Sequence, residues 1–386
     1  MTEKLYDLDS SICSFDARVT GCAPAGKGWT VTLDRTAFFP EGGGQQADTG
    51  SIGGARVTDV QETDGEILHY TDRPLPEGER FSCALDREQR RRRMQNHSGE
   101  HVISGLIHSL YGWENVGFHM GESCMTMDYS GELSWEELMR VETLANEAVR
   151  DDLPIRAWYP APEELAQMVY RSKLELTENV RIVEIPGIDR CACCAPHVKR
   201  TGEIGTVKIL TAERHRGGTR ITALCGMDAA EDYRRRQDSV AAISALLSAK
   251  RDEVAPAVER LLAERDALKE RTVRLSEALV KQRAESTPCT QGNLCVFDGE
   301  LLNEAALREL VNLLMERCGG MAAAFSGSDE TGYRYIIGSR SVDLRAHAKE
   351  INAGIGGKGG GSSAMIQGRA ACSASAIKKY LETAIF

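Results

Sequence analysis

The chain has 386 residues, a formal net charge of −10 and 42% hydrophobic residues. This length allows two to four domains with sizeable cores, and the composition is that of an ordinary soluble protein. No apolar run approaches the roughly 20 residues of a membrane span, and the N-terminal residues are too acidic for a signal peptide. We therefore expect a cytoplasmic protein with no membrane partner.

Twelve cysteines are scattered along the chain, and only Cys191, Cys193 and Cys194 cluster. In a reducing compartment this pattern favours metal binding and buried free thiols over disulfides.

Residues 1–88 hold short runs of alternating polar and apolar side chains separated by glycine and proline, which predicts a β-rich, barrel-like subdomain. Within it, three consecutive glycines that include Gly43 and Gly44 lie between Pro40 and Asp48. Glycine lets the backbone adopt φ > 0 or approach a ligand closely, although a simple flexible turn uses the same residues.

Residues 89–229 mix helical and strand patterns, which predicts an α+β domain. A helix is expected over residues 89–112, because apolar side chains recur at helical spacing and Gly112 ends the pattern. The other elements expected here are strands at 116–129, 180–185, 207–210 and 220–224, a helix at 135–149, and short helices at 163–169 and near Lys173.

Residues 230–287 are expected to form a helical linker. Apolar residues recur there at every seventh position, at Val240, Leu247, Val254, Leu261, Leu268 and Leu275. A seven-residue repeat predicts long helices that pack as a hairpin or a coiled coil. Pro256 should kink or break the helix.

The pattern of residues 288–386 predicts a small α/β domain with a glycine-rich loop at 354–363. Exposed amides around Lys358, Gly359 and Gly360 could cradle a phosphate, but a mobile connector has the same composition.

Basic residues are concentrated in three places despite the negative net charge. Arg92 and Arg93 belong to a run of four arginines, and Lys199 opens a stretch with six basic residues against two acidic ones. The tail from Arg334 onward has eight basic and three acidic residues. Such patches suit a polyanionic partner, whereas solvated helix faces and salt bridges are the simpler explanation.

Two pairs of side chains predict a zinc site. His97 and His101 are four residues apart, so they lie on one face of a helix, and Cys193 and His197 have the same spacing. Three imidazoles and one thiolate make a tetrahedral set suited to one Zn²⁺, with Cys191 or Cys194 as an alternative sulfur ligand.

A shell of four protein ligands is closed, which usually marks a structural zinc, whereas catalysis needs an open position or a separate group that activates water. Glu100 lies between the two histidines and could act as a general base. It could equally face solvent beside the arginines.

These ligand pairs, together with Thr201–Gly205, resemble the editing domain of alanyl-tRNA synthetases and of free-standing alanyl-tRNA editing (AlaX) proteins. The loop Phe38–Gln45 is similar to the segment that precedes this domain in the alanyl enzymes, and residues 288–386 resemble the DHH-associated C-terminal domain. Since residues 1–88 leave no room for a synthetase catalytic domain, we expect none in this chain. The long free-standing class is thus the best match, with the order 1–88, 89–229 (editing), 230–287 (linker) and 288–386 (tRNA binding).

The resemblance implies a zinc-dependent deacylase that acts in trans on mischarged tRNA(Ala), chiefly with serine and also with glycine. The catalytic candidates are Gln45 and, from its place between the two histidines, Glu100. Contacts with tRNA or substrate are expected at Gly43, Gly44, Arg92, Arg93, Lys199, Lys358, Gly359 and Gly360. A homodimer through the linker or the C-terminal domain is also expected. The alternatives are a non-catalytic tRNA-binding protein with structural zinc and a hydrolase of other acyl esters.

The sequence departs from the family pattern beside the expected amino-acid pocket. Glu100 stands where synthetase editing domains commonly have threonine, and Cys194-Ala195-Pro196 replaces the usual Gly-Gly-Thr. The stretch Gly117–Met120 replaces one that bears glutamine. These differences leave the identity of the hydrolysed amino acid open.

Overall fold

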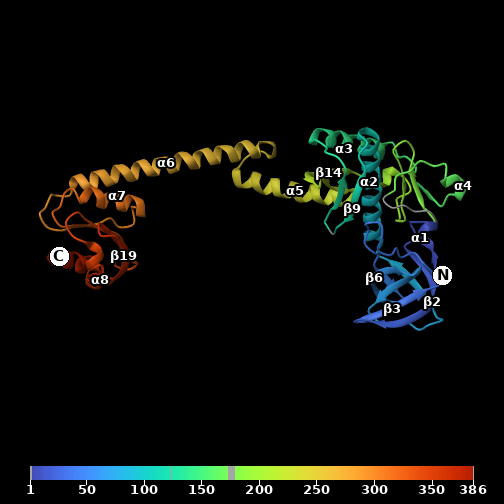
Figure 1. The fold of residues 1–386 in the computed structure, drawn as a ribbon, viewed down its shortest axis with the longest axis horizontal. Coiled ribbons are helices and arrows are strands. Elements are labelled where there is room, and N and C mark those ends of the chain that lie inside the picture. The colour runs from blue at the N-terminus through green and yellow to red at the C-terminus, as the bar shows by residue number, and fades with distance from the viewer. Residues whose placement is uncertain (1, 122, 173–178, 386) are drawn as a thin grey trace. The chain divides into compact units, whose positions relative to one another are not determined.

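The structure is a computed structural model that describes residues 2–121, 123–172 and 179–385. The chain divides into two compact units, Met1–Ala241 and Ala242–Phe386 (Figure 1). Both units contain helices and strands, which confirms a mixed α and β multidomain protein. The finer four-part division stays a prediction. Among the helices in the described ranges, none is long and apolar enough to cross a membrane.

Six strands of the first unit pair side by side in a closed ring, in the order β2-β3-β7-β6-β5-β8. Their side chains alternate between the interior and the surface, so Val31, Leu33 and Ile67 are almost completely buried. The strands are β2 (Ser14–Ala25), β3 (Gly28–Leu33), β5 (Gly50–Ile52), β6 (Ala55–Thr63), β7 (Glu66–Thr71) and β8 (Arg80–Leu85).

The N-terminal segment completes this part of the unit. Strand β1 (Glu3–Lys4) pairs in parallel with β4 (Arg35–Thr36), and the short helix α1 (Leu5–Leu8) follows β1. The glycine-rich loop leaves β4 and returns to the ring at β5.

Helix α2 (Arg87–Tyr111) carries the first pair of predicted ligands. Its start is capped by the side chain of Asp86, and Gly112 ends it with a φ of 73°, as the sequence predicts. Helix α3 (Trp135–Arg150) packs against α2 and begins with a capping box at Ser134.

A four-stranded sheet with the order β14-β15-β10-β9 also packs on α2. The stretch 116–129, predicted as one strand, is in fact a pair of antiparallel strands, because the amide of Gly121 bonds the carbonyl of Cys124 and closes a turn. The strands are β9 (Asn115–Met120), β10 (Met125–Tyr129), β14 (Val207–His215) and β15 (Gly218–Cys225).

A three-stranded antiparallel sheet leads to the second pair of ligands. It consists of β11 (Arg156–Trp158), β12 (Ile182–Ile185) and β13 (Asp189–Ala192), and α4 (Pro162–Leu165) follows β11. The helix predicted near Lys173 falls within 173–178, outside the described residues.

Two long helices occupy the predicted linker region. They are α5 (Gly226–Leu247) and α6 (Val254–Ser286), with the 3-10 turn η2 (Arg251–Glu253) before α6. The predicted break exists, but its position was wrong. The chain leaves helical geometry near Ser248, which has a φ of 49°, whereas Pro256 lies in the first turn of α6, where a missing amide costs nothing.

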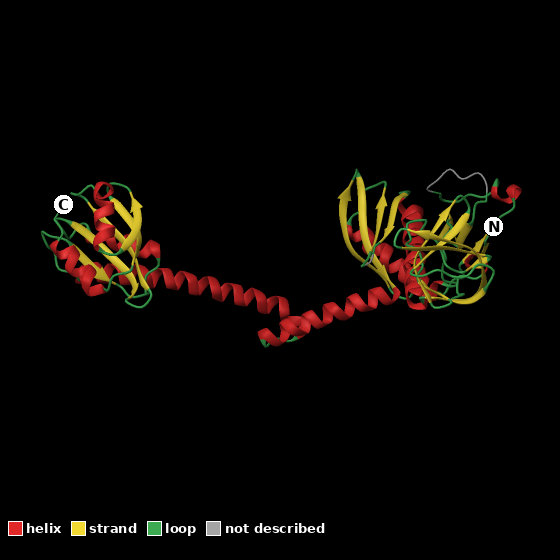
Figure 2. Ribbon diagram, turned by 90° about the horizontal axis from the view of Figure 1, so that it is seen from below, coloured by secondary structure: helices red, strands yellow, loops and turns green. Residues whose placement is uncertain are grey.

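The second unit holds a five-stranded sheet, and helices pack against it (Figure 2). The glycine-rich stretch predicted as a loop is strand β19, because its backbone pairs with β20 over five positions. The elements are β16 (Leu294–Phe297), α7 (Glu304–Leu314), β17 (Met321–Ser328), β18 (Gly332–Ser339), α8 (Leu344–Gly354), β19 (Gly357–Gly361), β20 (Met365–Ala370) and α9 (Ala374–Thr383).

Candidate metal centre and substrate cavity

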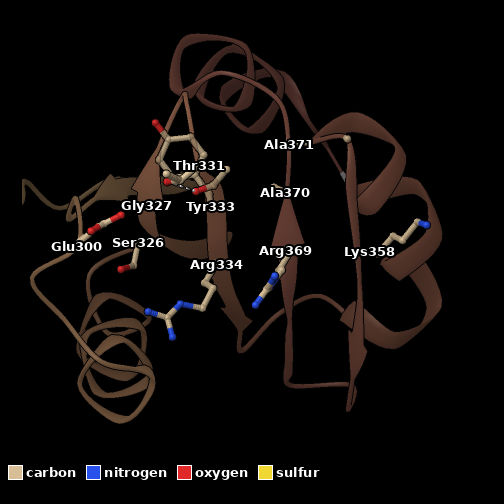
Figure 3. A pocket seen from close by; sticks show the side chains of 12 residues that line it. Glu300, Ser326, Gly327, Thr331, Tyr333, Arg334, Lys358, Arg369, Ala370 and Ala371 are labelled. Atoms are coloured by element: carbon tan, nitrogen blue, oxygen red, sulfur yellow. Dashed lines mark hydrogen bonds between the residues drawn. The ribbon is translucent and has the colours of Figure 1, made fainter.

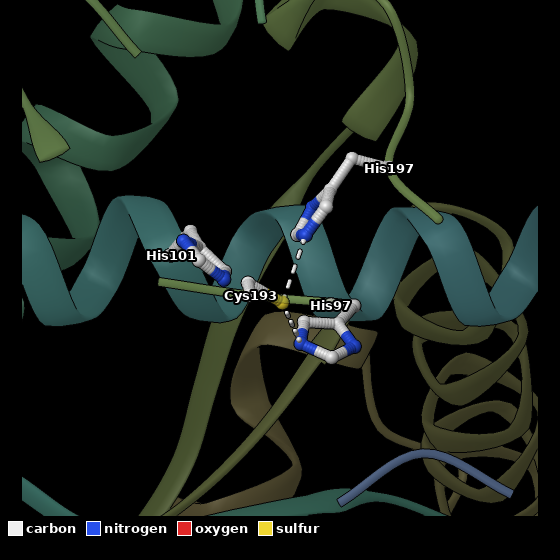
Figure 4. Close-up of side chains that lie close together, drawn as sticks. All are labelled: His97, His101, Cys193 and His197. Carbon is white, nitrogen blue, oxygen red and sulfur yellow. Dashed lines mark hydrogen bonds between the residues drawn. The ribbon is translucent and has the colours of Figure 1, made fainter. Parts of the chain in front are cut away.

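Four donor side chains converge beside helix α2 (Figure 4). His97 and His101 lie one turn apart on the helix, and their ligand atoms lie within 4.8 Å of those of Cys193 and His197. Sγ of Cys193 is 3.5 Å from Nε2 of His97 and 3.4 Å from Nε2 of His197.

The spacing of these donors fits a tetrahedral zinc ion. Zn–N bonds of about 2.0–2.1 Å and Zn–S bonds of about 2.3 Å place the nitrogen and sulfur atoms about 3.6 Å apart. The two observed separations from the sulfur of Cys193 lie within 0.2 Å of this value. The donor set therefore suits zinc in both chemistry and geometry.

The second ligand pair reaches the site without a helix. Cys193 and His197 lie in an irregular segment after β13, so the helical spacing argument holds for the first pair and was wrong for the second. Arg181 holds this segment instead, because its guanidinium donates to the carbonyls of Cys193 and Ala195.

Each histidine is oriented by a partner at its other ring nitrogen. Nδ1 of His101 lies 2.8 Å from Oδ2 of Asp189, and Nδ1 of His197 lies 3.0 Å from Oγ of Ser98. Nδ1 of His97 lies 3.0 Å from Oε1 of Gln45. Such contacts fix the ring and leave Nε2 for a metal.

Two of the four donors, Cys193 and His197, are already in the charge state that a metal requires. Burial alone would raise the pKa of the Cys193 thiol, but the charges and hydrogen bonds of the surrounding histidine rings together outweigh it and hold that pKa well below its usual value. Burial lowers the pKa of His197 to about 3, so this ring stays neutral. Burial would lower the pKa of His101, but the hydrogen bond to Asp189 outweighs it and holds that pKa well above its usual value. Because zinc binds thiolates and neutral imidazoles, His101 would release a proton when the metal binds.

The two alternative sulfur ligands are less suited to this role. Burial raises the pKa of Cys191 to about 11, which keeps its thiol protonated. Its sulfur belongs to a second group of close donors with His101 and Asp189. Cys194 instead faces the glycine-rich loop, with its sulfur 3.6 Å from where a Cβ of Gly43 would lie.

Asp189, which contacts His101, is one of the residues that the sequence analysis missed. Its side chain is buried and binds Arg171 as well as His101, with separations of 2.8 and 2.9 Å to the guanidinium. Strand β13 can come this close to α2 because position 105 is glycine: a Cβ there would lie 2.4 Å from the carbonyl oxygen of Ile188. In the sequence, Gly105 lies four residues after the predicted ligand His101, and this spacing is the one sign that another segment packs closely against α2 there.

A cavity of about 420 Å³ opens beside the donor cluster. Its wall includes three of the four donors, the loop glycines Gly43 and Gly44, and side chains of both charges. The remaining lining residues are Glu100, Phe118, Tyr159, Arg171, Ser172, Asn179, Arg181, Cys191, Ala192 and Cys194.

Glu100 lines this cavity and does not face solvent, so the solvent-exposed alternative was wrong. Only 3% of the residue is exposed. Its Oε1 accepts hydrogen bonds from Ser104 at 2.7 Å and from Asn115 at 2.6 Å, and its Oε2 lies 3.7 Å from Nε2 of His101.

The glycine-rich loop lies against the cluster, which its position in the sequence could not reveal. Gln45 in this loop is 1% exposed and lies behind His97, away from the cavity wall. This position suits a residue that orients His97 and not one that touches substrate. The carbonyl of Gly44 accepts the amide of Met120, which ties the loop to β9.

Arg92 and Arg93 of the arginine run on α2 are engaged by other groups of the protein. Arg93 is 9% exposed and donates to the carbonyl of Ala47, while Arg92 pairs with Asp228 and Glu231. These contacts argue against the predicted tRNA contacts at Arg92 and Arg93. The predicted contact Lys199 is exposed and pairs with Asp9 at 3.0 Å.

The second unit carries its own basic cavity, of about 760 Å³ (Figure 3). Arg334 on β18, Arg369 on β20 and Lys358 on β19 are register partners across adjacent strands and all line it. Gly359 and Gly360 follow Lys358 on the edge strand. The sequence analysis named Lys358 but missed the two arginines, which only strand pairing brings together.

Comparison with known proteins agrees with this architecture. Residues 180–222 match the family model described as the threonyl and alanyl tRNA synthetase second additional domain. The alanyl-tRNA editing protein AlaX-L of Pyrococcus horikoshii is 29% identical, with 96% of this chain and 95% of the relative covered.

Two similar ligases are much longer than this chain. The alanine–tRNA ligase of Natronomonas pharaonis is 32% identical over 90% of this chain, and that of Methanopyrus kandleri is 33% identical over 74%. The chain spans only 39% and 33% of these ligases, whereas it matches AlaX-L from end to end. In its family match and over nearly its whole length, the chain is thus similar to a free-standing alanyl-tRNA editing protein as well as to part of the alanine–tRNA ligases.

Proposed function

We propose that this protein is a zinc-dependent deacylase that removes a wrong amino acid, serine in the first place and also glycine, from tRNA(Ala). The observation that carries the proposal is the convergence of His97, His101, Cys193 and His197 beside a cavity that three of them line together with Glu100. Such a role would place the protein in the cytoplasm, where charged tRNA occurs.

The need for such an enzyme follows from binding energetics. A pocket built for alanine cannot strongly reject smaller glycine, and an added hydroxyl as in serine gives discrimination of only about 100-fold. A separate hydrolytic site removes the errors that remain. AlaX-L of Pyrococcus horikoshii carries the name of an editing protein, which supports the same role here.

The residues around the cluster would have separate roles in binding the metal, orienting its ligands and holding the substrate. Zinc, when bound, supplies a Lewis acid that polarises an ester carbonyl or a water molecule. Asp189, Gln45 and Ser98 would orient the three imidazoles. Glu100 would supply the negative charge beside the reacting ester, and Gly43 and Gly44 would leave room for the substrate backbone.

The second unit would hold the body of the tRNA. Arg334, Arg369 and Lys358 form a row of cations across three strands, and Lys358 is exposed. Gly359 and Gly360 add backbone groups at a sheet edge. Replacing Arg334 and Arg369 together by alanine should weaken tRNA binding and reduce its salt dependence, because each phosphate contact releases counterions.

A second candidate is a non-catalytic tRNA-binding protein with a structural zinc. One observation favours it, namely that four protein ligands make a closed shell. Hydrolysis of small acyl esters without tRNA is a third possibility, which the same experiment tests.

Purified protein with Ser-, Gly- and Ala-tRNA(Ala) decides among these functions. For the native protein we expect rapid deacylation of Ser-tRNA(Ala), slower deacylation of Gly-tRNA(Ala) and little deacylation of Ala-tRNA(Ala). The His101→Ala variant should deacylate none of the three faster than buffer does. Deacylation no faster than in buffer, with chelation causing only unfolding, would support the structural-zinc candidate. Equal turnover of a simple seryl ester without tRNA would support the general esterase.

A further inference from the structure

We propose that Glu100 binds the α-ammonium group of the aminoacyl ester, so that the site selects substrates with a free, charged amino group. The inference rests on the proposed deacylase function, because it concerns the substrate of that cavity. It gives Glu100 a binding role in addition to any role in proton transfer.

The charges around the cavity single out this residue. Among the described residues that line it, Glu100 is the only one with a carboxylate, while Arg171 and Arg181 also line it and are cationic. A positively charged substrate group would be repelled by the arginines and attracted to Glu100. Apart from the Cys193 sulfur of the donor cluster, Glu100 is therefore the anionic group that the described part of the wall offers to a cation.

The nearest other buried carboxylate is already committed. Both oxygens of Asp189 are engaged, one with Arg171 at 2.8 Å and the other with His101 at 2.8 Å and Arg171 at 2.9 Å. Asp189 is also absent from the described cavity wall. Asp189 thus supports the imidazole of His101 and does not reach the described wall of the cavity, whereas Glu100 does.

The orientation of Glu100 is fixed by its neighbours. Ser104 and Asn115 both donate to Oε1, and the hydroxyl of Ser104 lies 2.8 Å from that of Tyr129. These contacts hold one carboxylate oxygen away from the cluster and direct the other, Oε2, toward Nε2 of His101 at 3.7 Å. A held carboxylate binds a cation without first losing side-chain freedom.

The position of this oxygen matches the chemistry of the substrate. In an aminoacyl ester the ammonium nitrogen is attached to the carbon that bears the ester carbonyl. When that carbonyl lies at the donor cluster, the ammonium group must lie in the adjacent volume. Oε2 of Glu100 borders the same cluster, so a charge-assisted hydrogen bond can form there.

Replacing the ammonium group by a hydroxyl tests the proposal without adding bulk. Treatment of Ser-tRNA(Ala) with nitrous acid yields the corresponding α-hydroxy ester. For the native protein we expect kcat/KM to be about 30-fold or more higher for the amino ester, as is typical when a buried charge partner is lost. Glu100→Gln should lower kcat/KM for the amino ester and leave the hydroxy ester nearly unchanged, so the preference disappears.

A residue that only accepts a proton or supports the fold would behave differently. Glu100→Gln would then slow both esters by the same factor and retain the preference, which would overturn the proposal. Glu136→Gln, at an exposed carboxylate of α3, is the matched control and should leave both rates unchanged. Zinc content and thermal unfolding of each variant show whether the site and the fold are intact.

A binding measurement separates this proposal from the deacylase function. Serine linked by an amide to 3′-amino-3′-deoxyadenosine cannot be hydrolysed as an ester, and its α-hydroxy counterpart lacks only the ammonium group. Calorimetry should show tighter binding of the amino compound to the native protein and equal binding of both to Glu100→Gln. Such a preference without any deacylation would refute the deacylase function alone, whereas deacylation with no preference would refute the role of Glu100 alone.

Discussion

The support that Asp189 gives to His101 leads to a quantitative prediction. In Asp189→Asn the side chain keeps its size and loses its charge. The native carboxylate lies 2.8 Å from Nδ1 of His101 and binds Arg171, which is itself largely buried. The amide cannot neutralise Arg171, and it no longer favours the tautomer in which Nε2 of His101 is free for a metal.

The size of the effect follows from these two losses. Removing a partner behind a metal-binding histidine typically weakens metal affinity by about 10- to 100-fold, or about 1.4–2.8 kcal/mol. Breaking a buried ion pair by removing one member costs about 3–5 kcal/mol of stability. Asp189→Asn should therefore reduce both zinc affinity and the stability of the metal-free protein.

Zinc affinity is measured by competition with a chelator, and stability by denaturant unfolding of the metal-free protein. The control is Asp152→Asn, which breaks an exposed pair with Arg200 and should cost no more than about 1 kcal/mol. If Asp189→Asn binds zinc as tightly as the native protein, Asp189 does not orient His101 for the metal. A loss no greater than that of Asp152→Asn would refute the buried ion pair as a source of stability.

Three further predictions concern other parts of the chain. Burial lowers the pKa of His69 to about 4 in the folded state, below its unfolded value near 6.5, so stability should fall by about 3 kcal/mol as pH drops across this interval. The fall should be smaller in His69→Gln when unfolding is followed at several pH values. Gly44→Ala should destabilise the protein by about 1–3 kcal/mol and reduce deacylation, because φ is 81° and the new Cβ would lie 2.6 Å from the carbonyl oxygen of Phe118. Gly65→Ala, with a φ of 78° and open space, is its control in the same unfolding assay. The predicted homodimer is tested by light scattering: Leu268→Glu, at a position 61% exposed on α6, should yield monomers if the heptad residues form the interface.

Local patterns in the sequence predicted the elements that depend on nearby residues. The limits of α2 and α3 follow from the caps at Asp86, Gly112 and Ser134, and each cap acts within one turn of the backbone. The pairing of His97 with His101 is equally local, since one helix turn separates them. The second pair, Cys193 and His197, was chosen on a helical spacing that the structure does not have, and Cys191 and Cys194 stayed open as alternative ligands.

Other features depend on contacts between distant segments and were not predictable. Asp189 meets His101 across 88 positions of sequence, and Gln45 meets His97 across 52. The glycine-rich stretch of the second unit has loop composition but becomes β19 because β20 supplies its hydrogen bonds. Arg92 and Arg93 have the composition of an RNA-binding run. Only the structure shows that Arg92 pairs with Asp228 and that Arg93 donates to the carbonyl of Ala47.

The closed shell does not by itself exclude catalysis at this site. The four donors come from one helix and from a loop about ninety residues later, so a metal bound to them also joins separate parts of the fold. Removing zinc should then lower stability whether or not the ion takes part in hydrolysis. Loss of activity on chelation is therefore weak evidence for a catalytic zinc. Glu100→Gln is more informative, because it alters a cavity carboxylate that is not one of the four donors.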